Sequence, residues 1–248
     1  MRVQRVGFAA IKGTRHLTRS SVHLTADGAE GDRRFAIVDP ATHHVLRTVA
    51  HPSLARVEAR VDADLLTLQF PDGTAFSGST DRTGAPVTGD YWGRPVLLHP
   101  LDGALAACLS SALGRPATLC ASDPGQVVWG APVSVVTTGA LHQLEHALRA
   151  AGQDVPTDLA ERFRATMTLE AASDPMPGSR LQVGAAVIEI VGAIDRCAVV
   201  DADPRTGLRA GGLLAALARP DGPPLFGLGA RVVEPGTVVP GDRVVVMP

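Results

Sequence analysis

The sequence predicts a mainly β protein with a few helices, an α+β fold. Gly, Pro and Val are abundant, and short apolar runs are separated by turn signals at modest spacing, which favours β-rich barrels over a helical bundle. The 248 residues are enough for one large unit or for two small domains with real cores. We expect two units, 1–98 and 99–248, because the segment 77–89 is rich in Ser, Thr, Gly and Pro and carries little that packs.

Short apolar runs in the first unit predict strands. The runs cover residues 3–8, 34–38, 54–61, 65–70 and 96–98. Asp39-Pro40 and Pro71-Asp72-Gly73 bound them, since Pro presets φ and Gly accepts positive φ.

Helical periodicity appears first in the second unit. Apolar residues recur at spacings of three and four over 101–113 and 140–151, which predicts two helices, and Cys108 falls on the first pattern as a core residue. The remaining runs predict strands at 133–136, 183–191, 230–233 and 243–246 and a short helix at 211–218. His142 and His146 match zinc motifs only in part, so we expect them to be surface residues.

Composition excludes several classes of partner and compartment. The net charge is −2 and no basic run occurs, whereas nucleic-acid binding needs clustered Lys or Arg. No window resembles a signal peptide or a membrane span. The three cysteines are odd in number and far apart, which signals neither a disulfide framework nor a zinc knuckle. We expect a cytoplasmic protein with reduced thiols and no membrane or nucleic-acid partner.

Cys197 and Lys12 are the two residues that chemistry alone singles out. Cys197 follows Arg196 at the end of an apolar run and precedes a polar loop, a setting that favours a thiolate able to bind a metal or attack an electrophile. The alternative is a buried, inert cysteine. Lys12 is the only lysine among 23 basic residues; arginine-rich composition explains this simply, but Arg cannot replace a compact, titratable ammonium.

Several weak motifs occur in a specific order along nearly the whole chain. They are Ala10-Ile11-Lys12-Gly13, Gly31-Asp32-Arg33-Arg34-Phe35, Trp92-Gly93-Arg94, Arg162-Phe163-Arg164, Arg196-Cys197 followed by Val200-Asp201-Ala202-Asp203-Pro204-Arg205-Thr206-Gly207, Leu225-Phe226-Gly227 and Gly241-Asp242. This order resembles the MOSC family preceded by its N-terminal β-barrel domain. The family takes its name from the C-terminal domain of molybdenum cofactor sulfurases and includes the amidoxime-reducing components.

The resemblance implies an N-terminal β-barrel domain followed by a MOSC β-barrel-like domain. It also implies a molybdenum cofactor, in which the dithiolene of a pterin (molybdopterin) and one protein cysteine hold the metal; that cysteine corresponds to Cys197. A soft thiolate suits such a metal, and cations suit the pterin phosphate. The residues that the resemblance assigns to the cofactor are Lys12, Arg33, Arg34, Thr137, Arg164 and Thr166.

Three positions depart from the pattern of the amidoxime-reducing branch. Thr166 stands where an Asn is expected, and Val49 stands where an Arg is expected, with Arg47 as the nearest replacement. Asp195 replaces a small neutral residue, and a carboxylate there would raise the pKa of the Cys197 thiol if it lies close. These departures leave room for a different substrate, a different cofactor form or a barrel that binds no molybdenum.

The resemblance implies an oxidoreductase that reduces N-hydroxylated or N-oxide compounds by oxygen-atom transfer at a Cys197-bound molybdenum. No iron-sulfur cysteine pattern and no dinucleotide fingerprint occurs, so a separate electron-transfer protein is implied beside the small-molecule substrate. One alternative is a sulfur carrier that uses a Cys197 persulfide. Another is a repurposed barrel in a specialised pathway, without molybdenum. The sequence leaves the oligomeric state open.

Overall fold

An eight-stranded sheet forms the larger part of the fold in the computed structural model, which describes residues 1–209 and 211–248. Only β12 and β13 pair in parallel; all other neighbours in this sheet are antiparallel. In spatial order the strands are β18 (Val244–Val246), β14 (Arg180–Val183), β15 (Ala186–Asp195), β16 (Leu225–Glu234), β12 (Val133–Thr137), β13 (Met167–Glu170), β1 (Arg2–Phe8) and β2 (Leu17–Arg19).

Three smaller sheets complete the β structure of the described residues. The four-stranded sheet has the order β5 (Phe35–Val38), β11 (Thr118–Ser122), β10 (Arg94–Pro100) and β9 (Val87–Tyr91). One three-stranded sheet is a meander of β6 (Glu58–Asp62), β7 (Leu65–Gln69) and β8 (Ala75–Ser79). The other joins β17 (Gly236–Val238), β3 (Val22–Thr25) and β4 (Gly28–Ala29).

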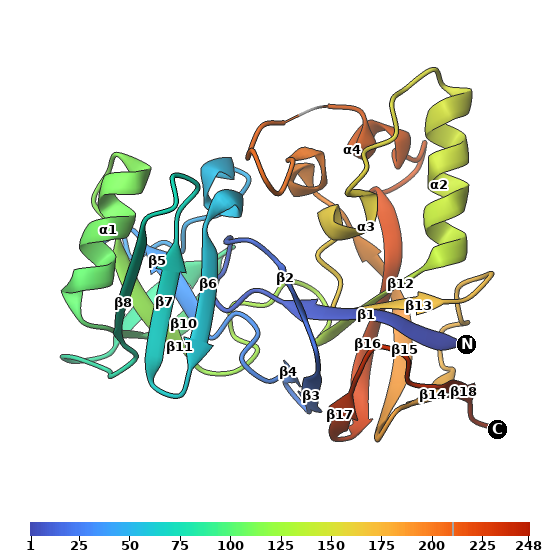
Figure 1. The fold of residues 1–248 in the computed structure, drawn as a ribbon, viewed down its shortest axis with the longest axis horizontal. Coiled ribbons are helices and arrows are strands. Elements are labelled where there is room, and N and C mark those ends of the chain that lie inside the picture. Colours follow the sequence, from blue (N-terminus) through green and yellow to red (C-terminus); the bar gives the residue numbers. More distant parts are fainter. Residues whose placement is uncertain (210) are drawn as a thin grey trace.

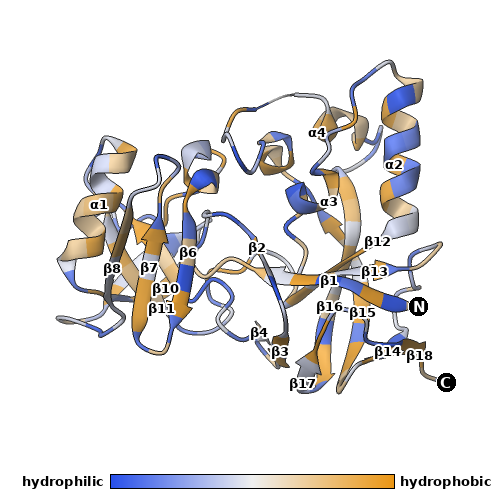
Figure 2. Cartoon of the chain, in the orientation of Figure 1, coloured by the Kyte–Doolittle hydropathy of each residue, from blue (hydrophilic) through white to orange (hydrophobic). Residues whose placement is uncertain are grey.

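The helices are few and mostly short. They are α1 (Gly103–Leu113), α2 (Thr138–Ala150), α3 (Leu159–Arg162), α4 (Leu213–Ala216) and the 3-10 turns η1 (Pro52–Arg56) and η2 (Ala198–Asp201). On α2 the leucines at 141, 144 and 148 are buried, the spacing that places residues on one helix face, and its outer face is hydrophilic (Figure 2). The fold is thus mainly β with a few helices, as predicted.

Two lobes lie side by side in Figure 1. One contains α1, β5–β8, β10 and β11; the other contains β1, β12–β18 and the helices α2–α4, and both chain ends lie in it. The core of the second lobe combines Val3, Val6 and Leu24 with residues from β12–β18, while Leu105 and Leu109 of α1 belong to the core of the first. Residues before the predicted boundary at Leu98 therefore pack in the core of the second lobe, and residues after it pack in the core of the first. The domain boundary stays a prediction.

Two predicted strands differ from the structure. The first half of 54–61 is the 3-10 turn η1, because Pro52 fixes φ at its start and Leu54 and Ala55 are buried in a turn rather than in a ladder. The run 183–191 is split by Gly184, whose φ is +56°, so Val183 ends β14 and Ala186 begins β15. A hairpin replaces the single strand there.

Candidate functional site

Cys197 lies at the rim of a cavity of about 400 Å³ between the two lobes. It follows the end of β15, precedes η2 as its N-cap residue and is exposed. Four of the residues that the resemblance assigned to a cofactor line the same cavity. They are Lys12, Arg33, Arg164 and Thr166.

Positive charge dominates this cavity. Lys12 Nζ lies 4.9 Å from the centre of the Tyr91 ring, and in residues 1–209 and 211–248 no carboxylate lies within ion-pair distance of it. Burial holds the pKa of Lys12 well below its usual value, and the neighbouring Arg33 and Arg164 lower it further. Arg33 is paired with Asp32. The cations therefore have too little negative charge around them, which favours an anionic ligand.

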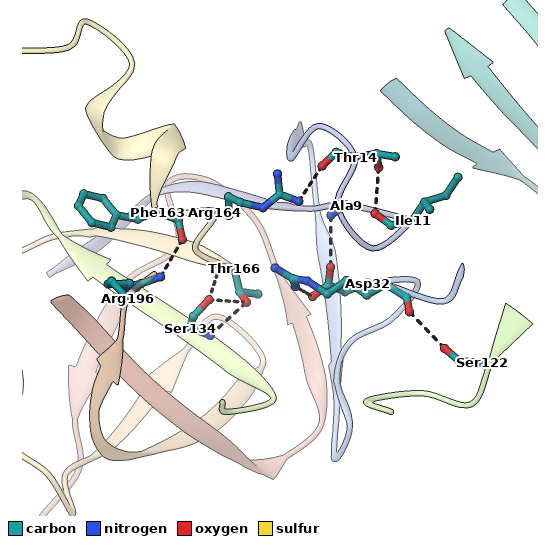
Figure 3. A network of polar contacts seen from close by, with 11 residues as sticks. Ala9, Ile11, Thr14, Asp32, Ser122, Ser134, Phe163, Arg164, Thr166 and Arg196 are labelled. Atoms are coloured by element: carbon teal, nitrogen blue, oxygen red, sulfur yellow. Dashed lines mark hydrogen bonds and ion pairs between the residues drawn. The ribbon is translucent and has the colours of Figure 1, made fainter. Parts of the chain in front are cut away.

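Arg164 reaches across from the turn after α3 to the segment that follows β1 (Figure 3). Its Nη2 donates to the carbonyl of Thr14 at 2.6 Å. Burial, followed by the nearby Arg33, lowers its pKa to about 9. A guanidinium in this state gains from any anion that enters the cavity, because the anion offsets both the burial and the like charge.

Unusual backbone conformations gather at the cavity. Of the five non-glycine residues with positive φ in the described chain, three line it: Arg33 at 49°, Trp92 at 58° and Arg164 at 52°. The left-handed region costs about 1 kcal/mol or more for such residues and persists where surrounding contacts impose it. The local strain here orients two cationic side chains and an aromatic one toward the same space.

Arg196 fixes the segment that carries Cys197. Its Nε donates to the carbonyl of Phe226 at 2.7 Å. Its Nη1 donates to the carbonyl of Phe163 at 3.0 Å (Figure 3). Burial lowers its pKa to about 10. Within the described residues its Nη2 and the hydroxyl of Tyr91 are buried without a hydrogen-bond partner, and both residues line the cavity. Two residues of the cavity lining thus each have a buried hydrogen-bond donor that lacks an acceptor.

The Thr166 hydroxyl is held by Ser134 on β12. It accepts from the backbone nitrogen of Ser134 at 3.1 Å and lies 3.3 Å from the Ser134 hydroxyl, while Ser134 Oγ accepts from the nitrogen of Thr166 at 3.0 Å. This closed set of bonds, visible in Figure 3, ties β12 to the segment before β13. Both residues line the cavity. The hydroxyl groups of Thr166 and Ser134 thus stand where the resemblance led us to expect the side-chain amide of an Asn at position 166.

Two family models together cover nearly the whole chain. The model described as MOSC N-terminal beta barrel domain matches residues 1–116, and the model described as MOSC domain matches residues 119–245. The chain belongs to the MOSC family. No curated protein matches it.

Solved structures resemble this MOSC protein only distantly. The YuaD protein from Bacillus subtilis is 12% identical, with 98% of this chain and 93% of that chain covered and a TM-score of 0.47. YiiM from Geobacillus stearothermophilus is 16% identical, with 48% and 55% covered and a TM-score of 0.32. Structural similarity at these TM-scores does not support an inference about function.

Two of the residues assigned by the resemblance lie outside the cavity of this MOSC chain. Thr137 is fully buried and caps α2: its hydroxyl accepts from the nitrogen of Ala140 and donates to Asp174 at 2.6 Å. Arg34 lines a separate cavity beside Phe8 and Glu30, because the left-handed backbone at Arg33 changes the direction of the chain between the two side chains. Thr137 and Arg34 are therefore not brought to Cys197.

Other cysteines and histidines take no part in the site. Cys120 is buried, which raises its thiol pKa to about 11, and Cys108 packs against the core of the first lobe. His142 and His146 are exposed on α2, as expected, and the described chain contains no group of three or more side chains able to hold a metal ion. Asp195 is exposed but lines the cavity together with Val49.

The MOSC site also contains residues that the sequence did not indicate as ligand contacts. Tyr91, Trp129 and Ser134 line the cavity, yet none stands in a local pattern that predicts it. Trp92 and Arg196 lie within the motifs Trp92-Gly93-Arg94 and Arg196-Cys197, and only these motifs indicated that they belong to the site. The remaining contacts arise from strand pairing over long sequence separations.

Proposed function

We propose that this MOSC protein is a molybdenum-cofactor-binding oxidoreductase that reduces N-hydroxylated or N-oxide substrates, with Cys197 as the protein ligand of the metal. One observation carries the proposal: an exposed thiol shares a cavity with Lys12, Arg33 and Arg164, and of these three cations only Arg33 has an ion-pair partner among the described residues. A thiolate supplies the soft ligand that molybdenum prefers. The cations supply the partners of a phosphate.

The residues present fit such a cofactor. The unpartnered Tyr91 hydroxyl and Arg196 Nη2 are donors, and a pterin with its phosphate offers many acceptors. When bound, the cofactor would supply the two-electron and oxygen-atom-transfer chemistry that side chains lack.

Each side chain has a distinct task under this proposal. Lys12 acts as a point charge and Arg33 and Arg164 as forked donors toward the phosphate. Burial raises the pKa of Tyr91 to about 12, so its hydroxyl stays protonated at neutral pH and serves as a donor. Arg196 keeps the Cys197 segment in place through its two backbone carbonyl contacts. A separate electron-transfer protein would deliver the electrons.

Reduction of benzamidoxime with a reduced viologen as artificial donor tests the proposal. The amidoxime takes up two electrons and two protons, its N–O bond breaks, and benzamidine and water leave. We expect turnover by protein that contains molybdenum and loss of turnover in Cys197→Ser. Molybdenum-containing protein that reduces neither amidoximes nor N-oxides would overturn the proposal.

A sulfur carrier is the second candidate, because Cys197 is the exposed cysteine among the three. A persulfide on its thiolate would then be formed by a separate desulfurase. Mass spectrometry of metal-free protein after incubation with a desulfurase and cysteine checks this: one added sulfur atom on Cys197, absent in Cys197→Ser, favours the carrier. Protein that takes up neither metal nor sulfur points to a repurposed barrel.

A further inference from the structure

The only two tryptophans of the chain lie together at the mouth of the Cys197 cavity. Trp92 occupies the turn between β9 and β10, and Trp129 lies in the segment between β11 and β12. Their ring centres are 5.4 Å apart with the planes tilted by 48°. They are 43% and 48% exposed, although a fold that used them only for packing would bury most of such large apolar rings.

A shallow groove of about 530 Å³ continues outward from Trp129. It shares four residues with the Cys197 cavity, Trp129, Ala131, Ile194 and Asp195, so the two spaces adjoin. Val191, 58% exposed, provides a further apolar wall. Part of the lining is glycine, and a Cβ added at Gly192 would meet no other atom within 4 Å. The groove is therefore flat where side chains would otherwise fill it, a shape that suits a planar ring.

The charges around the tryptophans discriminate against cations. The Arg47 guanidinium lies 4.1 Å from the centre of the Trp92 ring, and Arg94, which donates to the carbonyl of Val128 at 3.0 Å, lines the groove. Neither arginine has an ion-pair partner in the part of the chain that the structure describes. Among the described residues, Asp195 is the one carboxylate lining the groove. A neutral or anionic ring fits this setting better than a cationic one.

We propose that this groove is the substrate subsite and that it binds the planar aromatic part of the substrate, uncharged or anionic, stacked against Trp129, which lines both spaces and packs on Trp92. The inference rests on the proposed function, since it assigns the reacting group to the Cys197 cavity and the ring to the adjoining groove. Trp92 and Trp129 are then specificity-determining residues. Stacking supplies affinity for the ring while the reaction takes place next to it.

Intrinsic tryptophan fluorescence tests the subsite directly, because both reporters lie in it. Benzamidoxime is titrated into the protein, with cyclohexanecarboxamidoxime as the saturated analogue of similar size. We expect saturable quenching by the aromatic ligand and roughly tenfold weaker binding of the analogue. Trp129→Phe keeps a ring and retains most of the affinity, whereas Trp129→Ala loses roughly tenfold. A benzamidoxime with a 4-carboxylate binds more tightly than one with a 4-trimethylammonium group.

Leu97→Ala is the matched control, since Leu97 is 44% exposed on β10 but lines neither space. It leaves both affinities unchanged, and thermal melts verify that all variants fold. Equal binding of the ring and its saturated analogue, or unchanged binding in Trp129→Ala, would overturn the subsite. Ring binding without any reduction would instead overturn the proposed function and leave the subsite standing. In active protein, Trp129→Ala raises KM for benzamidoxime about tenfold with little change in kcat or in the KM of acetamidoxime.

Discussion

At the scale of residues, the site is built from charges that the protein does not balance by itself. Lys12 contacts the Tyr91 ring and lacks a carboxylate partner among the described residues, and Arg164 keeps its charge with a backbone carbonyl as its hydrogen-bond partner. Such an arrangement weakens the folded state when the cavity is empty of anions and gains when an anion enters. The same residues therefore link ligand binding to stability.

Lys12→Met separates these two effects. Removal of an uncompensated, largely buried cation stabilises the protein without ligand by about 1 kcal/mol, a rise in Tm of about 2–4 °C. Stabilisation by added inorganic phosphate shrinks at the same time, because a charge-assisted contact is lost. Differential scanning fluorimetry with and without phosphate measures both, with the exposed Arg231→Met as control. A lower Tm together with unchanged phosphate stabilisation would contradict the account.

His16 makes stability depend on pH. It is buried, its Nδ1 lies 2.9 Å from Arg5 Nη2, and burial followed by the charge of Arg5 lowers its pKa well below 6.5. Below about pH 6.5 the unfolded chain binds a proton at His16, whereas the folded chain does not. The free energy of unfolding therefore falls as the pH decreases. We expect His16→Phe to flatten the Tm profile between pH 6.5 and the onset of acid unfolding. The exposed His142→Phe keeps the wild-type slope.

At the scale of elements, buried arginines connect the short segments around Cys197. Arg196 joins the segment before η2 to β16 and to the turn after α3. Arg162 joins α3 to η2, with Nε on Asp158 at 2.9 Å and Nη1 on the carbonyl of Asp201 at 3.1 Å. These elements are too short to hold their positions alone, so the hydrogen bonds of the arginines position the thiol.

Arg196→Ala tests this positioning. Loss of two hydrogen bonds from a charged donor costs about 2–4 kcal/mol, and Arg196→Lys restores little because one ammonium cannot span both carbonyls. Urea unfolding monitored by circular dichroism gives the change, with Arg180→Ala, a member of an exposed ion pair, shifting stability by less than about 0.5 kcal/mol. An Arg196→Ala protein as stable as the control would refute the role.

Local patterns in the sequence predicted the elements that have a continuous apolar run or a helical period, and missed strands that have neither. The runs that became β1, β5, β7 and β12 and the periodic segments that became α1 and α2 were confirmed, because burial of one face imposes a readable period. β2, β3 and β4, of two to four residues each, are too short to show a period, and β8, β9 and β11, of five residues each, were missed because small and polar residues interrupt them. The existence of β3 depends on a partner distant in the chain, β17.

Only those residues of the candidate site that stand in sequence motifs could be predicted. Lys12, Arg33, Arg164 and Cys197 gather in one cavity, although 185 positions separate the first from the last. The local sequence did not show which of Arg33 and Arg34 faces the Cys197 cavity. The left-handed backbone at Arg33 decides this, and Arg34 lines a separate cavity. Trp129 and Ser134 are absent from every motif and come to the site through the packing of β12.

At the scale of the whole molecule, the two lobes share chain segments. β1 pairs with β13 and β3 pairs with β17, so the first 25 residues complete the sheets of the second lobe. The cavity lies where they meet, with Lys12 and Trp92 from one side and Arg164 and Cys197 from the other. The described residues contain no helix long and apolar enough to cross a membrane.

Separate expression of residues 1–116 and 117–248 tests this interdependence. The second fragment lacks β1 and β3 and leaves the apolar face that Val3, Val6 and Leu24 cover exposed, so we expect it to aggregate or to melt without cooperativity. Co-expression with the first fragment restores a soluble complex with a sharp transition. A cooperative melt of 117–248 on its own would show that the shared strands are dispensable.

The molybdenum content of protein purified from a molybdenum-replete host tests whether Cys197 is the metal ligand. We expect close to one molybdenum per chain in the wild type by elemental analysis, nearly none in Cys197→Ser and wild-type content in Cys108→Ser. The last variant controls for the loss of a thiol elsewhere. Wild-type protein without molybdenum, or a Cys197→Ser variant that retains it, would contradict the assignment of Cys197 as the metal ligand.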